Sequence, residues 1–294
     1  MTGFISKLSG LKIRRFFQGE KEIDISLSEE ELFQALQNLT GNDRLLGRYT
    51  EEEVRTSLAN YGVWKELSSR GYPDPYLTIR SIDPFRQRIR ILASPEAEET
   101  DENILAEFRL YDAHLSGPCP ITGETFSVDA LVIDWLLFQN PRAAFVPERP
   151  RLPGQRYPGL GILRTAVTAI IELARQVGKE AVVNIPEYYH NAVLYHPAFR
   201  FFSAYVEGRF LKLMLSLRNL SLADASHYVA EQKVWNVTKQ EQFVWKPHEQ
   251  ILPLSDRIKK YFQSEIYQVK VKEAETQTQF QVGHTTVESA HPEL

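Results

Sequence analysis

The sequence has almost no cysteine, since Cys119 is the only one among its 294 residues. A single cysteine excludes a disulfide framework within the chain and argues against a structural zinc site built on cysteines. His190 and His196 are six positions apart, which does not match the i, i+4 spacing of a metal pair on a helix. We therefore expect no metal centre, and a chain suited to the reducing cytoplasm.

Long apolar runs and an excess of basic charge are also lacking. No stretch of about 18 uninterrupted apolar residues occurs, so no membrane span is expected. The chain has 34 basic and 38 acidic residues and a formal net charge of −4, so no overall positive field attracts nucleic acid. These absences favour small molecules, peptides or other proteins as partners.

Apolar residues make up 43% of the chain, which is enough to bury a full core. We expect an N-terminal helix over residues 1–20, a main domain over 21–217, a C-terminal extension over 218–272 and a flexible tail over 273–294. The tail is expected because that stretch is rich in Thr, Gln and Glu. The extension is a candidate for covering a sheet edge, shaping acceptor specificity or forming a homodimer.

Hydrophobic periodicity and turn residues predict the main elements. Helices are predicted over 28–39, 50–69, 162–177, 221–233 and 255–267. Strands are predicted over 21–27, 76–82, 88–93, 104–115, 130–138, 181–185 and 243–254. The stretch 210–215 fits either a strand or a helix.

A glycine-rich turn that opens a helix is the clearest motif. Residues 154–161 read Gly-Gln-Arg-Tyr-Pro-Gly-Leu-Gly, and apolar residues then recur at helical spacing. The amides of Gly159, Leu160 and Gly161 precede a helix N-terminus, so this stretch can cradle a phosphate or pyrophosphate. A dinucleotide-binding turn fits poorly, because Arg164 occupies its third glycine position and the preceding strand ends twenty residues earlier.

The pattern Arg156-x-x-Gly159-x-Gly161, followed by a long helix and a strand, resembles the coenzyme A pyrophosphate loop of the GCN5-related N-acetyltransferases. The later segment Asn191-Ala192-Val193-Leu194-Tyr195 resembles a second motif of that superfamily. The resemblance implies a mixed α+β or α/β fold, in which helices flank a largely antiparallel central sheet. We expect the C-terminal extension to add further helices and strands to it.

The resemblance also implies site residues. Arg156, Gly159, Leu160, Gly161 and Asn191 would bind acetyl-CoA or another acyl-CoA as co-substrate. Tyr195 would protonate the departing thiolate; the alternative is an ordinary packed aromatic residue. Three aromatic residues, Tyr49, Tyr61 and Trp64, would contribute to the acceptor site, and Arg149 or Arg151 would contact the 3′-phosphate of coenzyme A.

Asp134 interrupts the most apolar predicted strand, where a carboxylate is costly unless it is paired. By resemblance, Asp134 is the candidate base that deprotonates the acceptor amine. The alternative is a carboxylate tied to a neighbouring arginine or to loop amides.

Together these features predict an acyl-CoA-dependent N-acyltransferase that transfers an acetyl group to a small-molecule or peptide amine. The alternative is a catalytically inactive module of the same fold that binds an acyl group, a nucleotide or a protein partner. Pro158, which removes one amide from the loop, and the absence of a glycine before Phe199 favour that alternative.

Overall fold

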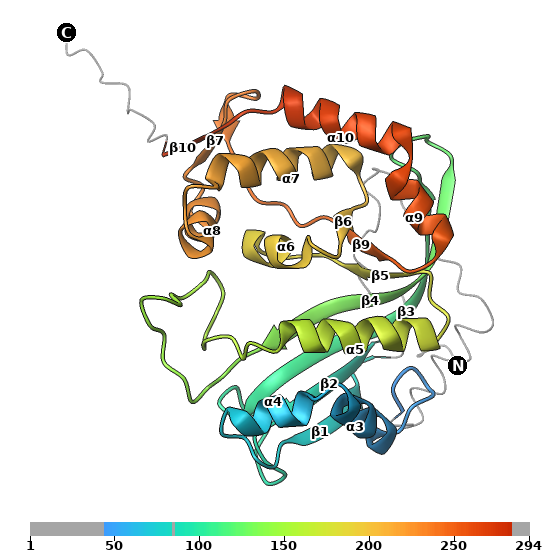
Figure 1. The fold of residues 1–294 in the computed structure, drawn as a ribbon, viewed down its shortest axis with the longest axis vertical. Helices are drawn as coiled ribbons and strands as arrows, with labels where there is room; N and C mark the ends of the chain where they lie inside the picture. The colour runs from blue at the N-terminus through green and yellow to red at the C-terminus, as the bar shows by residue number, and fades with distance from the viewer. Residues whose placement is uncertain (1–43, 84–85, 284–294) are drawn as a thin grey trace, which may run out of the picture.

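The computed structural model describes residues 44–83 and 86–283. The helix expected over 1–20, the strand over 21–27, the helix over 28–39 and the end of the expected tail, 284–294, lie outside these residues. Figure 1 shows the described chain as helices packed around a twisted sheet.

The centre of the molecule is a seven-stranded sheet in the order β1-β2-β3-β4-β5-β9-β6. Its strands are β1 Tyr76–Ser81, β2 Gln87–Leu92, β3 Ile104–Pro118, β4 Thr125–Phe138, β5 Ala181–Asn184, β6 Arg200–Phe201 and β9 Gln250–Pro253. Within the described chain, β4 and β5 form its one parallel pair, and the other neighbours are antiparallel. The mixed, largely antiparallel sheet expected from the sequence is therefore confirmed.

A small sheet and several helices complete the fold. The small sheet has the order β10-β7-β8, from β7 Val234–Asn236, β8 Glu241–Gln242 and β10 Phe280–Val282. The helices are α3 Glu51–Asn60, α4 Val63–Ser69, α5 Leu163–Gln176, α6 Tyr189–Tyr195, α7 Ala204–Leu217, α8 Leu222–Ala230, α9 Asp256–Gln263 and α10 Glu265–Gln277. The stretch 210–215, which fitted either state, is part of α7.

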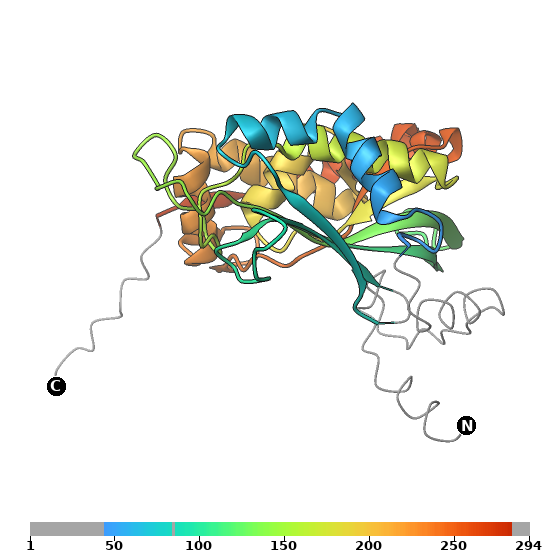
Figure 2. The ribbon, with the colours of Figure 1, turned by 90° about the horizontal axis from the view of Figure 1, so that it is seen from below.

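Alternation along the strands divides the core between the two faces of the central sheet. Leu131 and Val182 belong to a cluster that packs under α3, α4 and α5, and these helices lie together on one side of the sheet in Figure 2. Val132 and Val183 point the other way, into a cluster that includes Ile258 of α9. A third cluster joins α6, α7 and α8 to the small sheet.

The helix predicted over 50–69 is two helices. Its start is as expected, because Thr50 and Glu53 make both bonds of a capping box at α3. The break lies at Gly62, whose φ of +78° is a left-handed conformation that ends α3 and redirects the chain into α4.

The C-terminal region is also more continuous with the sheet than expected. Strand β9 is shorter than the predicted strand over 243–254 and lies between β5 and β6, so residues 218–272 supply part of the central sheet. The predicted helix over 255–267 is divided at Ser264, which caps α10. Residues 273–283, expected in the tail, form the end of α10 and β10, because Ala274 and Phe280 are packed against other elements.

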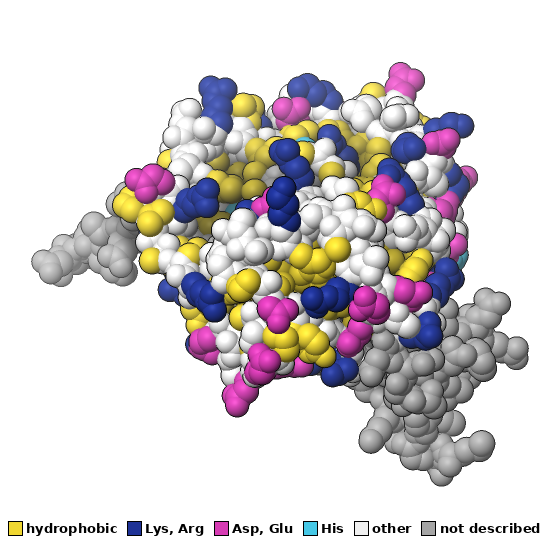
Figure 3. All heavy atoms as spheres, turned by 60° about the horizontal axis from the view of Figure 1, so that its bottom comes forward, with side chains coloured by type: hydrophobic (Ala, Val, Ile, Leu, Met, Phe, Trp, Pro, Cys, Tyr) yellow, Lys and Arg dark blue, Asp and Glu magenta, His cyan; other side chains and the backbone are white. Residues whose placement is uncertain are grey.

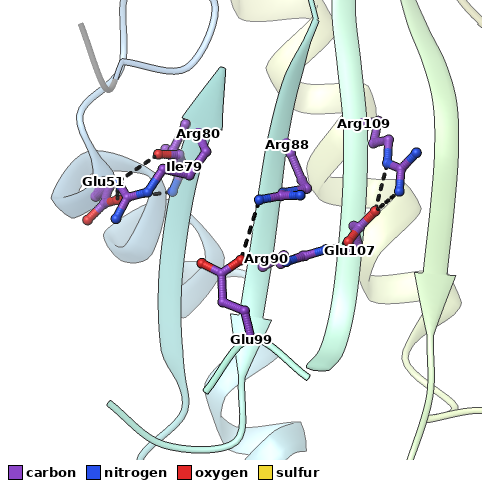
Figure 4. A network of polar contacts seen from close by, with 8 residues as sticks. All are labelled: Glu51, Ile79, Arg80, Arg88, Arg90, Glu99, Glu107 and Arg109. Carbon is purple, nitrogen blue, oxygen red and sulfur yellow. Dashed lines mark hydrogen bonds and ion pairs between the residues drawn. The ribbon is translucent and has the colours of Figure 1, made fainter. Parts of the chain in front are cut away.

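Charged side chains cover the face of β1, β2 and β3 opposite α3 and α5. In Figure 4, Glu107 lies between Arg90 and Arg109, and Glu99 lies beside Arg88 and Arg90. Glu107 is almost completely buried, with 4% of its side chain exposed. Arg90 and Arg109 contact its carboxylate at 2.6 Å, so each strand of this hairpin supplies a partner for the buried charge.

Candidate functional site

The glycine-rich loop presents a run of unpaired amides at the N-terminus of α5. Gly161 has a φ of +74°, and no side chain caps the helix at Ile162. Within the described chain, the backbone N–H groups from Gly159 to Thr165 donate to no protein acceptor; the first such bond is Ala166 N–H to the Ile162 carbonyl. Such a run can bind an anion, because its donors and the helix dipole favour negative charge.

An arginine that the sequence analysis missed lies beside this run. The Nη2 atom of Arg70 is 3.6 Å from the position that a Cβ on Gly161 would occupy. Its Nη1 atom donates to the Glu66 carbonyl at 2.7 Å and to the Glu66 carboxylate, which fixes the guanidinium. No sequence pattern connects Arg70 with Gly161, since α4 and the loop meet only in the folded chain.

Arg156 is paired with the acidic loop that follows β2. Its guanidinium pairs with Asp101 and with Glu102, at 3.0 Å for Nη2 to Oε1 of Glu102, and 57% of its side chain is exposed. The guanidinium of Arg156 is therefore already engaged by two carboxylates of the acidic loop after β2, whereas Arg70 lies beside Gly161.

The loop is held at the end of β4. The Asn140 N–H donates to the Pro158 carbonyl at 2.7 Å, and a Cβ on Gly159 would lie 4.0 Å from the Phe138 carbonyl oxygen. Leu160 is buried in the first core cluster, so it can offer a ligand only its backbone. The preceding arm, 139–153, is anchored as well, because His227 contacts the Arg151 carbonyl at 2.8 Å.

Strands β4 and β5 separate beside this loop. Their parallel pairing runs from Ala130 and Ala181 to Ile133 and Asn184. Strand β5 then ends, whereas β4 continues to Phe138 without a described strand on that side. Among the described residues, the edge of β4 beyond Ile133 therefore has no neighbouring strand on that side.

Three buried polar atoms have no hydrogen-bond partner among the described residues where β5, β9 and α6 meet. They are Oδ1 of Asn184, Oε1 of Gln250 and Nδ1 of His190. Asn184 and Gln250 are directly opposite each other in the sheet, and Gln250 Nε2 donates to the Ala192 carbonyl of α6 at 3.3 Å. Unpaired buried polar atoms are costly, so a ligand that supplies N–H or O–H donors here would be stabilised.

His190 is the titratable member of this group. Burial, with a smaller contribution from His227, lowers its pKa to about 4, so its imidazole is neutral at pH 7. Its ring stacks on Tyr188 at 5.4 Å. His196, whose spacing from His190 argued against a metal pair, contacts Glu207 at 2.7 Å. Among the described residues, no group of three or more His, Cys, Asp or Glu is arranged to hold a metal ion.

Tyr195 lies at the other end of α6, against the first core cluster. Its ring centroid is 6.0 Å from that of Phe199. Burial raises its pKa to about 12, so the phenol stays protonated at neutral pH and can act only as a proton donor. Asn191 is half-buried in the same helix, directly after His190.

Asp134 lies on the wrong side of the sheet to act with Tyr195. It is the extra residue of a β-bulge, since Ile133 pairs with Leu110 and Trp135 with Arg109. Its carboxylate is 3.5 Å from Arg86, which also neighbours Tyr111 in the second core cluster. The alternative role expected for Asp134 was an ion pair with a neighbouring arginine. The structure contains such a pair, with Arg86.

A mostly apolar groove of about 470 Å³ lies between α3 and α5. Tyr49 and Tyr61 line it, together with Ile170 of α5. Trp64 does not, because its indole N–H donates to the Arg55 carbonyl at 2.9 Å and its ring lies under the Arg55 guanidinium. Figure 3, seen from the side of α3 and α4, shows hydrophobic side chains gathered near the centre of this face among charged ones.

Comparison with known proteins adds no family. No protein-family model matches the sequence, and no curated protein is similar to it. In the described part of the chain, no helix has the length and apolar character needed to cross a membrane.

Proposed function

We propose that this protein is an acyl-CoA-dependent N-acyltransferase that acts in the cytoplasm on a small-molecule or peptide amine. The observation that carries the proposal is the run of free amides at the N-terminus of α5, beside the stretch of β4 that β5 no longer pairs with. Three buried polar atoms without a partner among the described residues lie where β5, β9 and α6 meet.

Coenzyme A has chemical groups that suit these donors and acceptors. Its pyrophosphate suits the amides of Gly159, Leu160 and Gly161, with Arg70 beside them. Its pantetheine arm carries amide N–H groups, which are the donors that the oxygens of Asn184 and Gln250 lack. The side chain of Asn191 is available on the same helix as His190.

The reaction proposed is direct attack of a neutral amine on the thioester carbonyl. The C–N bond forms, the C–S bond breaks, and the thiolate takes a proton from the Tyr195 hydroxyl. The nitrogen of the attacking amine gives up its extra proton to solvent, and solvent returns a proton to the Tyr195 phenolate, so the phenol is restored. Asp134 is not the base, because its carboxylate is paired with Arg86. Holding the two reactants together would supply most of the rate.

The acceptor would bind in the groove between α3 and α5. Its walls are apolar, and Glu52 and Glu53 stand among its lining residues. An amine on an apolar body fits this combination, because carboxylates attract its ammonium form while the walls bury the rest.

Calorimetry with acetyl-CoA tests the cofactor loop. The variant Gly161→Glu places a carboxylate among the amides and should weaken binding at least tenfold. Gly178→Glu is the matched control, because Gly178 has nearly the same φ, +75° against +74°, at the other end of α5. Undetectable binding by the wild type, or equal binding by Gly161→Glu, would contradict the proposal.

A non-catalytic module is the second candidate, favoured by the ion pairs that already engage Arg156 and Asp134. Thermal shift with coenzyme A esters, adenine nucleotides and acyl carrier protein separates the two. A ligand at a hundred times its Kd stabilises a protein by about 2.7 kcal/mol, which such a scan detects. If adenine nucleotides or acyl carrier protein stabilise the protein and coenzyme A esters do not, the result favours the non-catalytic module.

A further inference from the structure

A second pocket, smaller than the groove between α3 and α5, is lined by other residues than the glycine-rich loop and α6. It has a volume of about 190 Å³ and is enclosed by α7 and by the segment 239–248, which leads from β8 toward β9. None of its lining residues belongs to the glycine-rich loop or to α6. Its floor is apolar and its rim is basic, so a matching ligand would have one apolar part and one negatively charged part.

The floor is a fixed group of aromatic rings. Phe210 lies 6.2 Å from Trp245 and 5.0 Å from Phe201, measured between ring centroids. The indole N–H of Trp245 donates to the Pro186 carbonyl at 3.3 Å, and its ring meets Tyr189 edge-on at 5.9 Å. Because these contacts hold the rings in place, the floor is preformed and would accept a flat apolar group without rearrangement.

The rim carries more positive than negative charge. Arg209, Lys239 and Lys246 line the pocket, and Glu241 is its one carboxylate. Glu241 is 3.9 Å from Lys239. Neither Arg209 nor Lys246 has a carboxylate within 4.0 Å among the described residues, although Arg209 also lies over the ring of Tyr205. Two cations therefore face the pocket without a counter-charge.

The pKa of His248 also indicates that Arg209 and Lys246 lie near the same part of the pocket. Burial lowers its pKa, and the charges of Arg209 and Lys246 lower it further. An imidazole kept neutral leaves the two cations as the groups that an anion would meet. A carboxylate fits them, because a guanidinium binds a carboxylate through two parallel N–H bonds.

The geometry points to a binding site for a small aromatic carboxylate, with its ring on Phe210 and Trp245 and its carboxylate between Arg209 and Lys246. The volume limits the ligand to about one ring with a short acidic arm, since pockets for drug-sized ligands are roughly 300–1,000 Å³. This site is separate from the proposed acyl-transfer site. A test of one site therefore does not decide whether the other exists.

Calorimetry on the full chain with phenylacetate tests this assignment, with phenylacetamide, acetate and inorganic phosphate as matched probes. Phenylacetate should bind, and each of the three other probes should bind at least tenfold more weakly. The amide keeps the ring without the charge, acetate keeps the charge without the ring, and phosphate tests a plain anion site. No binding of phenylacetate, or equal binding of any of the three other probes, would overturn the assignment.

Variants locate the site on the surface. Arg209→Gln and Lys246→Gln should each weaken phenylacetate at least fivefold, whereas Lys212→Gln, on α7 but outside the pocket, should leave its affinity within twofold. Far-ultraviolet circular dichroism and the unfolding midpoint would show that each variant is folded. Lys246 is exposed, so its variant carries the test if Arg209→Gln does not fold. Unchanged affinity in a folded Lys246→Gln would overturn the assignment.

Discussion

At the scale of single residues, Glu107 illustrates a buried charge that the sheet has to neutralise. Burial acts against its ionised form, but hydrogen bonds from Arg90 and Arg109 outweigh that effect and hold the pKa of its carboxyl below the ordinary value. A lowered pKa in the folded state means that the carboxylate stabilises the fold above the ordinary pKa of about 4.5. This contribution is lost as the pH falls through the lowered pKa.

We predict that Glu107→Gln lowers the free energy of unfolding by about 1–3 kcal/mol at pH 7, because it removes the charged acceptor from two arginines. Urea unfolding at several pH values measures this. The difference from wild type should shrink as the pH drops below 4.5. The exposed Glu96→Gln is the control and should have little effect. A difference that stays constant down to pH 3 would refute the assigned role of the Glu107 charge.

Tyr195 is the residue at which catalysis and packing can be told apart. If its hydroxyl protonates the thiolate, Tyr195→Phe should reduce turnover by roughly 100-fold or more while acetyl-CoA affinity and stability hardly change. Turnover of the wild type should also show no alkaline loss from this group below its pKa of about 12. Free-thiol release with an accepted amine measures both. A Phe variant with turnover within a few-fold of wild type would leave Tyr195 as a packed aromatic residue.

At the scale of elements, helices α7 and α10 cross at a glycine. A Cβ on Gly208 would overlap the Val271 carbonyl oxygen and lie 2.8 Å from the Ala274 Cβ and 2.9 Å from the Glu275 nitrogen. The backbones of the two helices therefore approach each other at a point where any side chain would push them apart.

Gly208→Ala should therefore destabilise the protein by about 1–3 kcal/mol, even though alanine favours a helix by about 1 kcal/mol over glycine. Chemical denaturation measures the change. Leu215→Ala, an exposed position on the same helix, should cost less. If Gly208→Ala were as stable as wild type, that result would contradict the close approach of the α7 and α10 backbones at Gly208.

Elements with a strong local signal were predictable from the sequence, and those defined by distant partners were not. The spacing after Gly161 predicted α5 to within about two residues, and Thr50 with Glu53 marked the start of α3. The bulge at Asp134 was not predictable, because it depends on the register of β4 against β3. The bulge places the carboxylate of Asp134 within 3.5 Å of Arg86.

The candidate site shows the same division. The glycine-rich loop was recognisable because its glycines and the helix that follows them are adjacent in the sequence. Asn184 and Gln250 meet only because β9 pairs with β5, and their separation of 66 positions leaves no local pattern. Arg70 was missed for the same reason, since its approach to Gly161 depends on where α4 packs.

At the scale of the whole molecule, the central sheet cannot be completed by residues 21–217. Strand β9, at Gln250–Pro253, pairs with β5 on one side and with β6 on the other. A chain that ends at residue 217 would therefore leave one edge of β5 and the whole of β6 unpaired. It would also lack Ile258 and the other residues of α9 and α10 that complete the second core cluster.

We predict that residues 1–217 alone do not form a cooperatively folded protein, whereas residues 1–283 unfold in one transition, as the full chain should. The second fragment retains every described element. Differential scanning calorimetry and size-exclusion chromatography compare the two. A soluble 1–217 fragment with a sharp calorimetric transition would show that these residues form an independent domain.

The position of β9 also matters while the chain is being made. Strand β5 leaves the ribosome well before its neighbour, because residues 185–249 must be synthesised before Gln250 appears. During that interval one edge of β5 and the short β6 lack their shared partner, and an unpaired edge can bind another chain. Slow translation of residues 185–249 would therefore prolong the period in which nascent chains are prone to aggregate, and faster translation of this stretch would shorten it.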